Sequence, residues 1–221
     1  MKLLISAILK FLIGILLIGA LLFVPAGTFL YPNAWLLLAL LFVPILLLGA
    51  VLYIKAPALL EKRLNSKEKE GVQKGVLLIS ALLFIAGFVV AGLDFRFGWS
   101  HVHIAAVIVA CIAFLGSYAM YALVMRQNQY LSRTIEVREG QSVVDTGLYG
   151  IVRHPMYLAV IILFYSMPIA LGSLYSLACF LPFVVLLAVR IVNEERVLTK
   201  ELPGYTEYKR KVKYRLIPFI W

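Results

Sequence analysis

The segment from Gly147 to Tyr157 holds the residue types best suited to bind a polar ligand. Its Pro155 favours the first turn of a helix, where a missing backbone N–H costs nothing. Arg153 and His154 would then lie at that helix's N-terminus, where free N–H groups and a partial positive charge favour a carboxylate or phosphate. Arg153 adds a planar, bidentate donor for the same groups, and Tyr157 lies one turn further along the same face. A snorkelling arginine with interfacial His and Tyr side chains explains the same pattern equally well.

A second polar cluster follows the apolar run Leu181–Val189. Arg190 and Glu194 are spaced i,i+4 and can pair on one helix face, whereas Glu195 lies about 100° around the helix and can face a cleft instead. Two carboxylates at a membrane edge suit a cationic ligand. The alternative is an ordinary charged helix end.

The C-terminal segment contributes aromatic and basic residues. Pro203-Gly204 ends a helix, and the residues after it favour a short amphipathic helix. Its basic residues, with Phe219 and Trp221, are typical of a membrane-surface anchor. Tyr205 and Tyr208 either close over a site or pack the tail down.

Apolar segments position these clusters. Of the 221 residues, 63% are apolar and 14% charged, whereas soluble domains carry about a quarter charged residues. Four apolar runs are each long enough to span a bilayer: Leu3–Val24, Ala34–Ile54, Gly75–Leu93 and His101–Met125. The first is longer than the apolar core of a signal peptide and lacks a cleavage motif, so we expect a permanent span.

A fifth apolar region, from Met156 to Val192, is interrupted by Pro168 and by Gly172-Ser173. These breaks predict a helical hairpin, Met156–Leu171 followed by Ser173–Val192, with a first arm short enough to tilt or span only partly. The fold class expected is therefore all-α: a polytopic membrane bundle of five to six transmembrane helices, with a C-terminal hairpin and a cytosolic amphipathic tail. Residues 1–125 would form a scaffold of four spans, and residues 126–221 the functional region.

The charge distribution orients this bundle. The net charge is +10, yet the basic residues flank apolar spans, which favours membrane lipids over nucleic acid as the reason for the charge. If crossings alternate and the hairpin counts twice, every Lys and Arg except Arg96 falls on one side. By the positive-inside rule that side is cytoplasmic and holds both termini, and the agreement favours six crossings over five.

The remaining polar residues offer little chemistry. His101 and His103 form an H-x-H with no carboxylate or cysteine near it, so interfacial residues at a helix start are the better interpretation, and no metal is expected. Asp94 and Arg96 are expected to be solvated. Cys111 and Cys179 lie inside apolar runs and are expected to be small buried hydrophobes. The spans before residue 126 hold no mid-membrane acid, which argues against an ion-coupled transporter.

The three polar segments, in order and at this spacing, resemble the isoprenylcysteine carboxyl methyltransferases and the related membrane phospholipid methyltransferases. The resemblance covers roughly Gln127–Trp221, and the ending Tyr-Arg-Leu-Ile-Pro-Phe-Ile-Trp looks like prokaryotic members of the first group. The motifs that carry it are Gly147-x-Tyr149-x-x-x-Arg153-His154-Pro155-x-Tyr157, Arg190-x-x-x-Glu194-Glu195 and Gly204-Tyr205-x-x-Tyr208.

The resemblance implies roles for these residues. S-adenosylmethionine would bind on the cytosolic side, between the hairpin and the tail, and a lipophilic substrate would arrive from the bilayer. Arg153 and Glu194 would be catalytic, acting on the substrate and its reactive group. The residues expected to bind the cofactor are Tyr149, His154, Pro155, Tyr157, Arg190, Glu195 and Tyr205.

The reaction that the resemblance implies is methyl transfer from a sulfonium to a prenylcysteine carboxylate, in a prokaryotic cytoplasmic membrane. Such a carboxylate is anionic at neutral pH and needs no general base, so the site must supply alignment and partial desolvation. Three alternatives stay open: a phospholipid N-methyltransferase with Glu194 or Glu195 as base, a sterol-type reductase using a nicotinamide cofactor, and a non-enzymatic scaffold. The oligomeric state is not predicted.

Overall fold

The computed structural model describes residues 2–57, 60–61, 64, 71–128, 130–131, 137 and 140–221. These residues form helices and connecting turns without a strand, as the sequence predicts. The N-terminal helices are α1 (Lys2–Ala26), α2 (Pro32–Lys55), α4 (Gly71–Phe97) and α5 (Ile104–Gln127). The C-terminal elements are the 3-10 turn η1 (Gly147–Gly150), α6 (Pro155–Ala170), α7 (Leu174–Phe180), α8 (Phe183–Glu201) and α9 (Tyr205–Lys211).

Within the described chain, five helical segments are long and apolar enough to cross a membrane. They are Leu3–Ala26, Pro32–Lys55, Lys74–Phe97, Ile104–Gln127 and the α7–α8 segment Leu174–Glu201. The four early spans and the second arm of the C-terminal hairpin are therefore confirmed as apolar helical segments of spanning length. The first hairpin arm, α6, has 16 residues. It extends about 24 Å, less than the roughly 30 Å of bilayer hydrocarbon.

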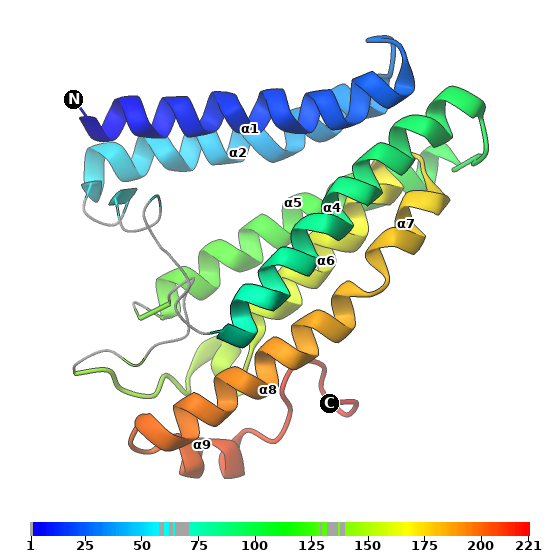
Figure 1. Cartoon of the computed structure of the whole chain (residues 1–221). Helices are drawn as coiled ribbons and strands as arrows, with labels where there is room; N and C mark the ends of the chain where they lie inside the picture. The colour runs from blue at the N-terminus through cyan, green and yellow to red at the C-terminus, as the bar shows by residue number, and fades with distance from the viewer. Residues whose placement is uncertain are drawn as a thin grey trace.

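The helices form two groups (Figure 1). Helices α1 and α2 lie antiparallel and cross the remaining bundle at a steep angle, meeting α4 near its C-terminal end. Helices α4 to α8 run along one another, and α5 and α6 make the most extensive helix contact. Prolines begin two of these helices, Pro32 for α2 and Pro155 for α6, as their fixed φ favours.

Aromatic rings fill the middle of the α4–α8 group. The Phe84 ring of α4 contacts those of Phe164, Phe180 and Phe183, with centroids 4.8, 5.3 and 4.9 Å away. Gly87 makes room for this cluster, because a Cβ there would overlap the Phe180 ring. The packing holds the hairpin, α6 to α8, firmly against α4.

The hairpin turn, Leu171–Ser173, is fastened to the end of α4. Asp94 is only 2% exposed and accepts hydrogen bonds from the Ser100 N–H, the Ser100 hydroxyl and the Ser173 hydroxyl, at 2.7, 2.7 and 2.5 Å. The expectation that Asp94 is solvated was therefore wrong. Local sequence places Asp94 in a connector, but the fold brings Ser173, 79 residues away, beside it.

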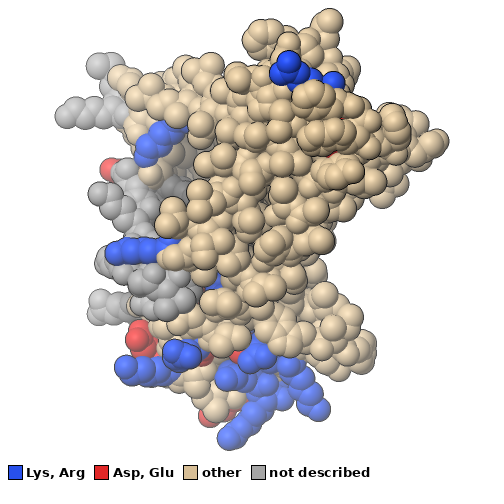
Figure 2. All heavy atoms as spheres, turned by 45° about the vertical axis from the view of Figure 1, so that its right-hand side comes forward, with Lys and Arg blue, Asp and Glu red and all other residues tan. Residues whose placement is uncertain are grey.

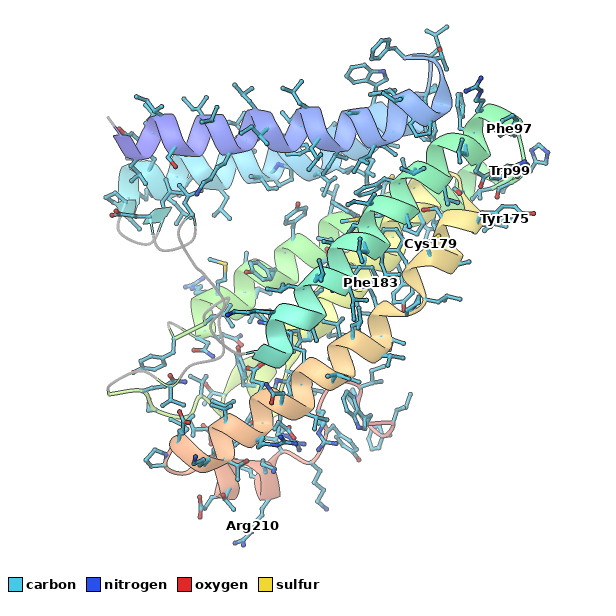
Figure 3. All side chains as sticks on the ribbon, in the orientation of Figure 1. Phe97, Trp99, Tyr175, Cys179, Phe183 and Arg210 are labelled. Atoms are coloured by element: carbon cyan, nitrogen blue, oxygen red, sulfur yellow. The ribbon has the colours of Figure 1, made fainter. Side chains whose placement is uncertain are left out.

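The two ends of the bundle differ in character. At the Asp94 end, exposed aromatic rings gather, with centroids 5.5 Å apart for both Phe97–Trp99 and Trp99–Tyr175 (Figure 3). Such rings are typical of a membrane interface. There His103 caps α5 by accepting a hydrogen bond from the Ala105 N–H. Lys and Arg gather instead at the α9 end, where Arg210 points away from the bundle (Figures 2 and 3).

Candidate functional site

A cavity lies at the α9 end, where the start of α6 and the end of α8 meet α9 and the loop before η1. Its mouth is open to solvent. Its polar lining comes from Asn128, Tyr130, Gln141, Ser142, Tyr149, Arg153, His154, Tyr157, Glu194, Tyr205 and Tyr208. Val143, Val144, Met156, Leu198 and Leu202 add apolar surface.

Local sequence explains how the first wall forms. Gly147 has φ 59°, and Leu148 donates its N–H to the side-chain oxygen of Gln127, so η1 is held against the end of α5. The Tyr149 hydroxyl accepts a hydrogen bond from the Asn128 amide at 3.1 Å. Pro155 then begins α6, and the residues just before it face the cavity at the helix N-terminus.

Behind this wall Glu195 holds three cationic or polar partners. Its carboxylate accepts from Arg153 Nε at 2.6 Å and from Arg215 Nε at 2.9 Å, and lies 3.2 Å from His154 Nε2. Arg153, His154 and Glu195 are 7%, 5% and 3% exposed. A buried carboxylate needs such partners to offset its desolvation, so the cluster stabilises all three side chains together.

Arg153 also holds the C-terminal segment in place. Its Nη1 donates to the backbone carbonyls of Val212 and Lys213, both at 2.7 Å. The backbone N–H groups of Arg153 and His154 donate to the carbonyls of Tyr214 and Arg215, at 2.9 and 2.8 Å. The tail is thus bound to the start of α6 by side chain and backbone alike.

Tyr157 connects the charged side chains of Glu194 and Arg190. Its hydroxyl donates to Glu194 Oε2 at 2.5 Å and accepts from Arg190 Nε at 2.9 Å. Glu194 lines the cavity, whereas the Arg190 guanidinium lies beside the Tyr157 ring, 6.0 Å from its centroid. The tyrosine therefore fixes the orientation of the Glu194 carboxylate and brings a positive charge near it.

The tyrosines of α9 close the cavity from the far side. Tyr208 donates its hydroxyl to the Tyr149 carbonyl at 2.8 Å. Tyr205 is 4% exposed and lines the cavity, yet among the described residues its hydroxyl has no hydrogen-bond partner. Burial raises the Tyr205 pKa well above its usual range, and the carboxylates of Glu195 and Glu194 raise it further. This hydroxyl stays protonated at ordinary pH and is available to a ligand.

Most of the residues predicted for the site meet at this cavity. Those that line it are Tyr149, Arg153, His154, Tyr157, Glu194 and Tyr205. Pro155, Arg190 and Glu195 are not among the lining residues; Pro155 begins α6, and the other two hold lining residues from behind. The i,i+4 spacing of Arg190 and Glu194 pointed to a link between them, which the Tyr157 hydroxyl provides.

Several contributors were missed by sequence reasoning. Asn128, Gln141 and Ser142 belong to a loop whose polar residues carry no distinctive spacing. Arg215 was assigned only to the basic tail, because one arginine among many tail cations carries no signal of its own. The better clue was the alternation of basic and apolar residues after Val212, which suits a segment lying along the bundle.

Comparison with known proteins bears on this arrangement. Residues 101–203 match the phospholipid methyltransferase family model. The matched segment contains α5 to α8 and stops before α9, so it includes every predicted site residue except Tyr205. It supports the resemblance at the level of membrane methyltransferases. The prenylcysteine branch and a prokaryotic origin remain predictions.

A second similarity lies over a shorter stretch. The chain is 35% identical over 91 residues to a Delta(14)-sterol reductase of Mus musculus. The aligned stretch is 40% of this chain. It spans about a fifth of that relative's length, 22%. Together with the apolar helices, the family match indicates an integral, multi-pass membrane protein.

Proposed function

We propose that this chain is an integral membrane methyltransferase that uses S-adenosylmethionine and acts on a lipophilic acceptor at the cytosolic membrane edge. The family match over residues 101–203 supports the reaction type. The observation that carries the proposal is the cavity at the α9 end. On its walls lie the Glu194 carboxylate and the Tyr205 hydroxyl, which has no hydrogen-bond partner among the described residues.

The cavity suits the proposed cofactor. A buried hydroxyl without a partner is costly, and a ligand with polar atoms would satisfy the one on Tyr205. The Glu194 carboxylate offers a negative charge to a cationic group. Val143, Leu198 and Leu202 would pack against a flat ring system, and Tyr149 and His154 would contact the same ligand.

When bound, S-adenosylmethionine supplies a methyl carbon whose bond to sulfur breaks as the acceptor's lone pair bonds to it and the sulfur keeps the bonding electrons. Glu194, held by Tyr157, would attract and orient the cationic end of the ligand in a cavity partly shielded from water. In this proposal Arg190 and Glu195 act through the residues they hold.

Arg153 would orient an anionic acceptor. Its Nε and Nη1 are bonded to Glu195 and to two carbonyls, which fixes the guanidinium plane in the cavity wall. Nη2 takes no part in these three bonds and would donate to an acceptor carboxylate. A prenylcysteine carboxylate fits this arrangement and needs no proton removed.

A phospholipid amine is the alternative acceptor, and the family match favours it. An ammonium must lose a proton before it attacks, so Glu194 would then serve as base. Transfer of labelled methyl from S-adenosylmethionine to a prenylcysteine analogue, compared with phosphatidylethanolamine, separates the two acceptors.

A reductase is the second candidate, because the chain is similar to a sterol reductase over 91 residues. Titration calorimetry in nanodiscs distinguishes it. We expect binding of S-adenosylmethionine and of its demethylated product, with little heat from a reduced nicotinamide dinucleotide. Nicotinamide binding without S-adenosylmethionine binding would overturn the methyltransferase proposal.

A further inference from the structure

The chain after α9 returns along the apolar part of the bundle. Leu216 is buried against Tyr157, Leu187 and Ile191, and Trp221 packs against the same cluster. Leu187 lies eight residues before Glu195 on α8, or about 12 Å along the helix axis. The tail therefore reaches the level of side chains that belong to a segment of membrane-spanning character. Figure 1 shows its end beside α8.

Five backbone N–H groups of this turn are hydrogen-bonded within it. The main-chain oxygen of Trp221 accepts from the N–H groups of Arg215, Leu216 and Ile217, at 2.9, 3.0 and 3.3 Å. The Ile217 carbonyl accepts from Ile220 and Trp221, at 3.2 and 3.1 Å, and Pro218 has no N–H to satisfy. Hydrogen bonds made within the turn lower the cost of placing these backbone groups in lipid, where an unsatisfied polar group is expensive.

The tip of the turn is apolar and uncovered. Phe219 and Ile220 are 87% and 77% exposed, and Phe219 has a φ of 65°, which is strained for a bulky side chain. In water, both the strained backbone at Phe219 and the exposure of its apolar ring are unfavourable. The same ring placed in lipid removes its apolar surface from water.

Charges at the base of the turn fit a position at the edge of the bilayer. The Arg215 guanidinium bonds Glu195 and lies 5.1 Å from the centroid of the Trp221 ring, so its charge is met within the protein. Lys213 is exposed just before it, where lipid phosphates would lie.

We propose that residues 215–221 form a re-entrant turn whose tip, Phe219 and Ile220, is embedded in the lipid of the bilayer. The tail then does more than lie on the membrane surface: it inserts beside α6 and α8, next to the cavity wall. This placement is independent of which reaction the cavity performs.

Site-directed fluorescence tests the proposal on the full chain in nanodiscs. Cys111 and Cys179 are replaced by alanine, and a bimane label is attached in turn at Phe219→Cys, Ile220→Cys and Arg210→Cys. Arg210 is the matched control, because it is exposed on α9 and points away from the bundle (Figure 3). Quenching is measured with aqueous iodide and with lipids carrying a nitroxide near the headgroup.

We expect lipid nitroxides to quench the label strongly at 219 and 220, with an iodide quenching constant severalfold smaller than at 210. The label at 210 should show the reverse. Iodide quenching at 219 and 220 as strong as at 210, in preparations that elute as the unlabelled protein does, would overturn the proposal. Two separate tip positions guard against one label that disturbs the turn.

Discussion

Arg153 and Glu195 lie 42 residues apart in the chain, and their side chains meet at 2.6 Å in a buried ion pair. Through this pair the start of α6, the end of α8 and the C-terminal segment form one unit. Arg153 bonds two tail carbonyls, and Glu195 bonds the tail's Arg215. The cavity wall depends on this unit because His154 is part of it.

Glu195→Gln should lower stability strongly. The neutral amide leaves the charges of Arg153 and Arg215 without compensation, which costs roughly 3 kcal/mol for a broken buried pair. Thermal unfolding in detergent, followed by fluorescence, measures the loss. Glu201→Gln is the control, because Glu201 is exposed at the end of the same helix, and it should change little. Equal melting temperatures for the two variants would contradict the role given to Glu195.

Tyr157→Phe should weaken cofactor binding more than it affects the fold. The hydroxyl that orients Glu194 and links it to Arg190 is lost, while the ring keeps its packing. We expect an affinity about tenfold lower, or ~1.4 kcal/mol. Calorimetry measures it. Tyr165→Phe on the same helix removes an exposed hydroxyl bonded to the Leu181 carbonyl and should leave affinity unchanged. An unaltered affinity in Tyr157→Phe would contradict the positioning role.

Tyr205→Phe should affect ligand binding, whereas Tyr208→Phe should affect the stability of the protein. The Tyr205 hydroxyl has no hydrogen-bond partner in the part of the chain that the structure describes, so removing it should leave the free protein as stable as before and weaken ligand binding. Removing the Tyr208 hydroxyl deletes its bond to the Tyr149 carbonyl and should cost about 1 kcal/mol of stability. Melting curves with and without ligand separate the two effects. A ligand-induced shift that survives intact in Tyr205→Phe would show that its hydroxyl does not reach the ligand.

Alkaline pH should loosen the cavity. Burial raises the Tyr149 pKa from 10 to about 12, against the opposing effect of the Asn128 hydrogen bond. The folded state disfavours the Tyr149 phenolate. The contribution of this group to the stability of the fold is therefore fully present below pH 10 and is lost as the pH rises toward about 12. The loss from this one group approaches about 2 kcal/mol. The free energy of unfolding, measured across this pH range, should fall less steeply for Tyr149→Phe than for the unaltered protein. Identical slopes would exclude Tyr149 as a cause of the alkaline loss of stability.

The sequence predicted the elements better than the contacts between them. Apolar run lengths located the four early spans, and Gly172-Ser173 located the hairpin turn, because hydrophobicity and backbone limits act locally. The predicted break at Pro168 was wrong, since this proline lies inside α6. The burial of Asp94 was not predictable, since it depends on Ser173 from a distant turn. The positions of Arg190 and Glu195 behind the cavity wall depend on helix rotation, which spacing fixes only relative to neighbours on the same helix.

The tail was predicted in part. Basic and aromatic residues indicated a membrane anchor, yet the composition did not distinguish Trp221, which packs inward, from Phe219, which points outward. That difference arises from the hydrogen bonds that fold residues 215–221 back on themselves, and no local sequence pattern predicts these bonds.

The hydrogen bonds of Asp94 have a mechanical consequence. They fasten the turn of the hairpin to α4 at the end of the bundle opposite the cavity. At the cavity end, the Arg153–Glu195 pair joins the start of α6 to the end of α8. The hairpin is therefore tied at both of its ends, and the cavity wall it forms is held in place from each.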